Sequence, residues 1–330
     1  MAMSKLLESL TPDNALTILD ALKDQKADGE QWELFRYAWA VADPENAMQH
    51  ALRLEGRTRR NAIEDTLAGW ASRSPDEALE WVNSLENSDE QERFRGSFLE
   101  GLADHDIGQA TDYVMERSKA GDKQAHRYME TVTREQLRRG SIEEAARWSE
   151  DLPDGKLKGQ AMDHVAGRFV HQSPEAAAAW AAQYAEASYG ARVIEEVGDE
   201  WAERDPSAAV AWLQSLPEGK GQTEGMESAL EEWAGRDPTS ASEFLITMGD
   251  SELKDSAVSG FARRVVREDP EAAMAWANTI DQPEMRTKTM TTAAREWLRR
   301  DREAATNWLE SSNLPSETMN AILHGGKRRS

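Results

Sequence analysis

The sequence contains no cysteine, which excludes a disulfide framework, a thiolate zinc site and an iron–sulfur cluster. No apolar run approaches the roughly 18 residues of a membrane span, and the opening MAMSKLLESL does not read as a secretion signal. Basic residues are outnumbered, with 39 Lys and Arg against 61 Asp and Glu and a formal net charge of -22. Because phosphate backbones attract clustered positive charge, we expect no nucleic-acid partner. We expect no membrane segment either, and a cytoplasmic location by default, or a periplasmic or exported one if a signal has been removed.

Motifs of the common enzyme classes are also missing. The six histidines form no HExxH zinc motif, and the chain has no P-loop, no GxGxxG and no GxSxG. Carboxylates are so abundant that a pair of them identifies no catalytic site. We therefore predict a protein that is not an enzyme and that needs no cofactor and no metal ion.

What the sequence does contain is a repeat of about 32 residues, marked by proline. Seven of the eleven prolines lie at the same position of the repeat, which we call the phase position. Continuing the step of about 32 residues through the gaps gives ten phase positions: Pro12, Pro44, Pro75, Ile107, Ile142, Pro174, Pro206, Pro238, Pro270 and Arg302. The residue before each position is Ser, Thr or Asp. Such a residue caps the free amides of a first helical turn, and proline fits next because it lacks an N–H that would be unpaired there. Each position therefore predicts a helix start.

Alanine and tryptophan follow the same phase. The third residue after each position is always alanine: Ala15, Ala47, Ala78, Ala110, Ala145, Ala177, Ala209, Ala241, Ala273 and Ala305. Eleven of the twelve tryptophans lie either six residues after the phase position or five residues before it. Residues three apart share a helix face, so we interpret both types as repeat core. An aromatic binding surface is the alternative.

Each unit reads as a helical hairpin, with helix A of about eleven residues, a short turn and helix B of about fourteen. One hairpin of this size cannot bury its apolar face alone, so neighbouring hairpins must stack. The predicted fold class is all-α, a right-handed superhelical solenoid of about ten helix-turn-helix repeats. We expect a single domain over residues 1–330, with repeats at 12–315, cap helices at 1–11 and 316–324, and a disordered tail at 325–330.

The DPxxAxxW core and the hairpin length give the chain a resemblance to the α-solenoid class of helical-hairpin repeats, and in unit size it is similar to tetratricopeptide repeats. Its core motif differs from the tetratricopeptide signature, in which Trp-x-x-Leu-Gly opens the first helix. The resemblance implies a scaffold whose concave face holds a partner protein or an extended peptide.

Departures from the repeat mark candidate partner-binding residues. The unit at 107–141 lacks the phase proline and tryptophan, is three residues longer, and supplies Tyr113, His126, Arg127, Arg134 and Arg138. The alternative is a drifted repeat with a solvated basic strip. Trp32, the one tryptophan outside both slots, is either an exposed aromatic contact or the core of a terminal unit.

Alanine also occurs on helix A away from the core positions, as at Ala179 and Ala211. Small side chains suit a crowded concave surface, so we expect helix A to line the inner face and helix B the outer face. The alternative explanation is that alanine is simply a good helix former.

Negative charge is concentrated in residues 151–250, which hold 19 acidic and 7 basic side chains, mostly with the excess on helix B. This excess is either a solvated surface or a docking surface for a basic partner. The predicted function is a non-catalytic scaffold for a protein or extended peptide, possibly basic, with an unknown oligomeric state. The alternatives are a groove enzyme acting on a polymer and a self-associating structural protein.

Overall fold

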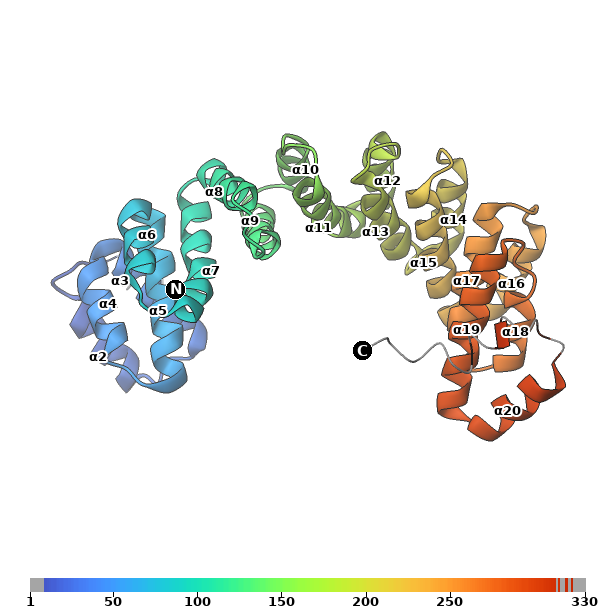
Figure 1. Ribbon diagram of the computed structural model, residues 1–330. Coiled ribbons are helices and arrows are strands. Elements are labelled where there is room, and N and C mark those ends of the chain that lie inside the picture. The colour runs from blue at the N-terminus through green and yellow to red at the C-terminus, as the bar shows by residue number, and fades with distance from the viewer. Residues whose placement is uncertain (1–8, 313, 315–317, 320–321, 323–330) are drawn as a thin grey trace. The chain divides into compact units, whose positions relative to one another are not determined.

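The computed structural model describes residues 9–312, 314, 318–319 and 322 (Figure 1). In that part of the chain the structure is all-helical, with nineteen α-helices, one short 3-10 helix and no strand. No helix among these residues is long and apolar enough to cross a membrane. The expected cap helices at 1–11 and 316–324 lie largely outside the described residues, and the tail at 325–330 lies wholly outside them.

The chain divides into two compact units, Met1–Trp148 (unit 1) and Ser149–Ser330 (unit 2). The helices of unit 1 are α2 (Ala15–Asp24), α3 (Gly29–Ala42), α4 (Pro44–Leu52), α5 (Gly56–Arg73), α6 (Pro75–Ser84), α7 (Ser88–His105), α8 (Ile107–Lys119) and α9 (Ala125–Arg139). The division falls inside α10 (Ile142–Glu150). Unit 2 continues with α11 (Lys156–Gln172), α12 (Pro174–Ala181), η1 (Ala182–Tyr184), α13 (Gly190–Ala202), α14 (Pro206–Ser215), α15 (Lys220–Arg236), α16 (Pro238–Thr247), α17 (Glu252–Val265), α18 (Pro270–Ala277), α19 (Pro283–Arg300) and α20 (Arg302–Ser311).

The even-numbered helices are the A helices of the repeat and the odd-numbered helices are the B helices. Every A helix from α4 to α20 begins at its phase residue, as the sequence predicts. The capping residue before the helix is an aspartate in six of these nine, and in each of the six its carboxylate accepts a hydrogen bond from an amide of the first turn. The N-cap and proline signals thus place these helix starts to the residue.

The first A helix differs, because α2 begins at Ala15 rather than at Pro12. The side chain of Asn14 accepts from the Thr11 amide at 2.8 Å and donates to the Ser9 carbonyl at 2.7 Å. These two bonds hold residues 11–14 as a turn, which delays the helix by about one turn.

The phase alanines are buried, whereas of the eleven phase tryptophans five are buried and six are half-buried. All ten phase alanines have exposed fractions of 2% or less. Aromatic rings from the two tryptophan slots contact each other where a B helix leads into the next A helix. Four such pairs have centroids 5.3–6.0 Å apart: Phe169–Trp180, Trp201–Trp212, Trp233–Phe244 and Trp297–Trp308. Helix pairs therefore share a periodic aromatic and alanine core.

Successive B helices pack closely within each unit, as α3, α5 and α7 do in unit 1 and α11, α13, α15 and α17 do in unit 2. In unit 2, Figure 1 shows α11, α13 and α15 side by side, with α12 and α14 on one side of them. Among the described residues, successive A helices contact each other slightly or not at all. The B helices therefore form the crowded layer.

The crowding that we inferred from alanine on helix A occurs between the B helices instead, and glycines on the B helices explain why. A Cβ at Gly69 on α5 would overlap the Tyr37 carbonyl of α3, and a Cβ at Gly260 on α17 would overlap the Glu227 carbonyl of α15. The missing side chains let neighbouring B backbones approach each other. Ala179 and Ala211, two of the helix A alanines that suggested crowding, are exposed. That helix A lines a concave inner face stays a prediction.

Candidate functional site

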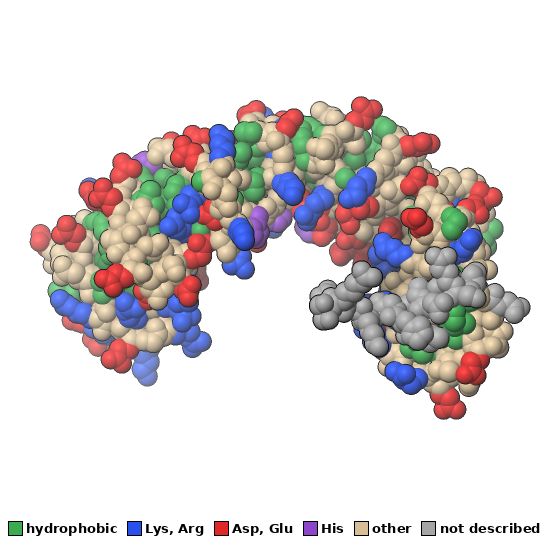
Figure 2. Space-filling model, in the orientation of Figure 1, with side chains coloured by type: hydrophobic (Ala, Val, Ile, Leu, Met, Phe, Trp, Pro, Cys, Tyr) green, Lys and Arg blue, Asp and Glu red, His purple; other side chains and the backbone are tan. Residues whose placement is uncertain are grey.

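Carboxylates of three consecutive B helices gather on unit 2, and Figure 2 shows acidic side chains over α13 and α15. We define the acidic face as Asp163 on α11, Glu195, Glu196, Asp199 and Glu200 on α13, and Glu232 on α15. The close packing of the B helices brings these residues together, because each helix presents its carboxylates beside those of its neighbour. The sequence indicated the charge excess on helix B but not this juxtaposition across helices.

Mutual repulsion and burial perturb the two central carboxylates. Burial, followed by the charges of Asp163, Glu200, Asp199 and Glu195, raises the pKa of Glu196 to about 7. Burial and the charges of Glu232, Glu200, Glu203 and Glu195 likewise raise the pKa of Asp199 to about 6. A carboxylate with a raised pKa marks a place where negative charge is poorly compensated.

Arg192 and His171 contact the edges of the acidic face and leave its centre without an ion pair. Arg192 donates to Asp163 at 3.1 Å, and His171 lies 3.3 Å from a carboxylate oxygen of Glu200. In the described part of unit 2, neither Glu196 nor Asp199 has an ion pair with a cation within 4.0 Å. The centre is therefore a half-buried surface with unbalanced negative charge.

Two of the three arginines predicted in the unit at 107–141, Arg134 and Arg138, form ion pairs with carboxylates of unit 1. Arg134 donates to Glu100 at 2.7 Å, and Arg138 donates to Glu135 at 2.7 Å and lies 3.7 Å from Asp104. Glu100 and Asp104 belong to α7, so these contacts join α9 to the neighbouring B helix. The strip therefore carries little uncompensated positive charge.

The other predicted residues of this unit lie in different surroundings. Tyr113 is half-buried, packs against Phe98 with centroids 5.5 Å apart, and accepts a hydrogen bond from Arg95 at 3.0 Å. His126 and Arg127 are exposed. The ring nitrogen Nδ1 of His126 lies 2.8 Å from the Lys123 carbonyl. The structure therefore places Tyr113 in the packing between α7 and α8 and leaves His126 and Arg127 on the surface of α9.

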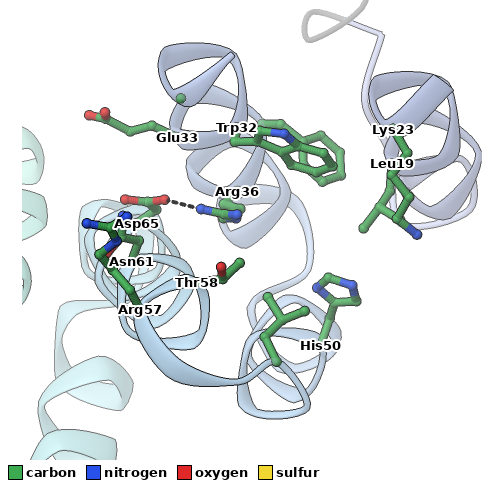
Figure 3. Close-up of a pocket in the computed structure, with 13 residues that line it drawn as sticks. Leu19, Lys23, Trp32, Glu33, Arg36, His50, Arg57, Thr58, Asn61 and Asp65 are labelled. Atoms are coloured by element: carbon green, nitrogen blue, oxygen red, sulfur yellow. Dashed lines mark hydrogen bonds and ion pairs between the residues drawn. The ribbon is translucent and has the colours of Figure 1, made fainter. Parts of the chain in front are cut away.

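Trp32, the tryptophan outside the repeat slots, lines a cavity of about 560 Å³ between α2, α3, α4 and α5 (Figure 3). Its ring packs edge-on against Phe35 with centroids 6.1 Å apart, and the Arg36 guanidinium lies 5.4 Å from its centroid. Sequence reasoning missed Arg36, His50 and Asp65 as lining residues. They come from three different helices, and no periodic signal links them.

In the described residues, no group of three or more His, Asp or Glu side chains is placed to hold a metal ion. No family model matches the chain, and neither curated proteins nor solved structures show a significant similarity to it.

Proposed function

We propose that the chain is a non-catalytic scaffold of the α-solenoid type, similar in its hairpin units to tetratricopeptide arrays and coiled as a right-handed superhelix. Its acidic face on unit 2 would hold an extended, basic segment of a partner protein. The observation that carries the proposal is the pKa of Glu196, raised to about 7 by burial and by four neighbouring carboxylates.

The arrangement of charge supports a cationic partner. Gathering like charges at half-buried positions destabilises the folded chain, and a bound Arg or Lys side chain would relieve that repulsion. The unpaired centre formed by Glu196 and Asp199 offers the largest gain, because their charges are partly desolvated and lack a cation of their own. Peripheral pairs such as Arg192 with Asp163 are already satisfied.

The arrangement of helices supports an extended partner. Acidic side chains come from α11, α13 and α15, which pack side by side, so a segment that contacts all of them must run across the helix axes. An extended chain rises about 3.3 Å per residue and packed helices lie about 10 Å apart, so a cation at every third residue would match the spacing.

A peptide with blocked ends, built from an Arg-Gly-Ser repeat and labelled with a fluorophore, tests this directly. We expect anisotropy titrations of the full chain to show binding that weakens steeply with salt, because exposed charges are screened. The same peptide with Gln in place of Arg should not bind. Equal binding of the two peptides would contradict the proposal.

Matched variants test whether peptide binding depends on the acidic face or only on the net charge of the chain. The double variant Glu196→Gln/Asp199→Asn should weaken Arg peptide binding by about tenfold, which corresponds to about 1.4 kcal/mol. The control Glu175→Gln/Glu218→Gln removes the same number of carboxyl groups from exposed positions of unit 2 outside the acidic face and should change affinity by less than about twofold. If both variants weaken binding equally, the peptide responds to total charge and not to this surface.

One observation favours a second candidate, an enzyme that acts on a polymer. A carboxyl group with a pKa of about 7 is suited to general acid or base catalysis near neutral pH, and Asp199 lies one helical turn from Glu196. A panel of polysaccharides and polypeptides would test this by release of reducing ends or of amines. Turnover that is abolished by Glu196→Gln would favour the enzyme over the scaffold.

A further inference from the structure

We propose that the Trp32 cavity of unit 1 binds a ligand with an apolar group next to a carboxylate, such as the C-terminal residue of a peptide. This site is separate from the acidic face and has the opposite charge preference. Its volume of about 560 Å³ lies within the range of about 300–1,000 Å³ typical of ligand pockets.

Apolar side chains form one part of the cavity. Phe35 and Leu19 are buried with exposed fractions of 0% and 3%, and both are among the residues that line the cavity. The half-buried ring of Trp32 packs edge-on against Phe35, which fixes its orientation. Figure 3 shows Trp32 and Leu19 on either side of the space, where they would contact an apolar group.

Arg36 supplies the positive charge. Its side chain is 13% exposed, and its Nη1 donates to Asp65 Oδ2 at 2.9 Å. Among the described residues, its Nε and Nη2 donate to no protein acceptor. A planar guanidinium with two unused nitrogens can bind a carboxylate through two parallel hydrogen bonds. The Trp32 ring and the Asp65 carboxylate restrain the orientation of this guanidinium.

The surrounding charges favour an anion. Burial lowers the pKa of His50, and the nearby cations Lys23, Arg36 and Arg53 lower it further, so this end of the cavity has a positive potential. Lys23 is paired with Asp20 through a contact that is largely exposed to solvent. Of the two acidic lining residues, Asp65 is occupied by Arg36, and Figure 3 shows Glu33 pointing away from the cavity.

The carboxylate preference is tested by calorimetry on the full chain with two probes, a blocked Gly-Gly-Gly-Phe peptide with a free C-terminal carboxylate and its amide. We expect the acid to bind at least about tenfold more tightly than the amide. N-acetylphenylalanine distinguishes the source of the ligand: affinity equal to that of the peptide indicates a free small acid, and weaker affinity indicates a peptide C-terminus. Equal binding of acid and amide, or no binding of either acid, would overturn the proposal.

Two variants locate the site. Arg36→Gln should weaken binding of the acid at least tenfold, whereas Arg60→Gln removes the same charge from an exposed position of α5 outside the cavity and should not. Since Arg36→Gln also leaves Asp65 unpaired, a second variant avoids that change. A Cβ at Gly29 meets nothing within 4 Å, so Gly29→Phe should fill the cavity without disturbing the helices. Gly249→Phe, at an equally open position between α16 and α17, is its control. Unchanged binding to Gly29→Phe would overturn the proposal.

Discussion

The indole ring of Trp201 packs against the indole ring of Trp212, with centroids 6.0 Å apart and ring planes at 42°. Trp201 lies near the end of B helix α13, and Trp212 lies in A helix α14. The same junction recurs at Trp297–Trp308 and, with a phenylalanine as one partner, at Phe169–Trp180 and Trp233–Phe244. At these four junctions the two tryptophan slots of the repeat are therefore partners in one contact, formed where the chain passes from a B helix to the next A helix.

Trp201→Ala should destabilise unit 2 by about 3–5 kcal/mol, because it removes a large buried ring and leaves a cavity beside Trp212. Urea unfolding followed by circular dichroism measures the loss. Trp201→Phe keeps a ring in the junction and should cost much less. A loss below about 1 kcal/mol for Trp201→Ala would show that the aromatic junction is not structural core.

Gly260→Ala should destabilise the chain by about 1–3 kcal/mol, because the added Cβ would overlap the Glu227 carbonyl and push α17 away from α15. Gly249→Ala is the matched control, since a Cβ there meets nothing within 4 Å. Thermal unfolding of the two variants compares them. If both are equally stable, the close approach of the B helices does not depend on glycine.

Asp205→Ala should cost about 1 kcal/mol, because the Asp205 carboxylate accepts a 3.0 Å hydrogen bond from the Ala208 amide at the start of α14. Ser173 occupies the same position before α12 without a side-chain capping bond, so Ser173→Ala should cost less than about 0.5 kcal/mol. Chemical denaturation of both variants checks the difference. A larger loss for Ser173→Ala would contradict the capping account.

Local signals made the repeat readable from sequence. Nine A helices begin at the expected residue because a capping side chain, a proline in the first turn, or both, determine the helix start. The departure at α2 comes from the side-chain bonds of Asn14, which compete with the helix. The phase alanines are buried because every hairpin repeats the same packing.

Contacts between residues far apart in the chain could not be predicted from these local signals. The inference that helix A is crowded was wrong because it rested on alanine, whereas close packing depends on where a glycine such as Gly260 meets a neighbouring backbone. The basic strip of α9 looked free because its partner Glu100 lies 34 residues from Arg134. The Trp32 cavity joins side chains of four helices, and the off-phase position of Trp32 was its one sequence signal.

The stability of unit 2 should fall as the pH rises from about 5 to about 8. The folded-state pKa of Glu196 is raised from 4.5 to about 7, so its contribution to stability is fully present below its unfolded pKa and is lost as the pH rises through about 7. Glu196→Gln should therefore stabilise the chain at pH 8 by about 1 kcal/mol, after allowance for solvent screening, and should have little effect near pH 5. Thermal melts across this range measure the effect. A variant that is stabilised equally at both pH values would contradict it.

The most direct measurement of the central claim is carboxyl labelling of the full chain, with and without the Arg-Gly-Ser peptide, read by mass spectrometry. If the acidic face binds the peptide, labelling of Glu196, Asp199 and Glu232 should fall by about threefold or more on binding, while labelling of Glu175 and Glu218 should not change. Protection spread evenly over all acidic residues, or confined to the A helices, would contradict the claim that the B-helix layer of unit 2 is the binding surface.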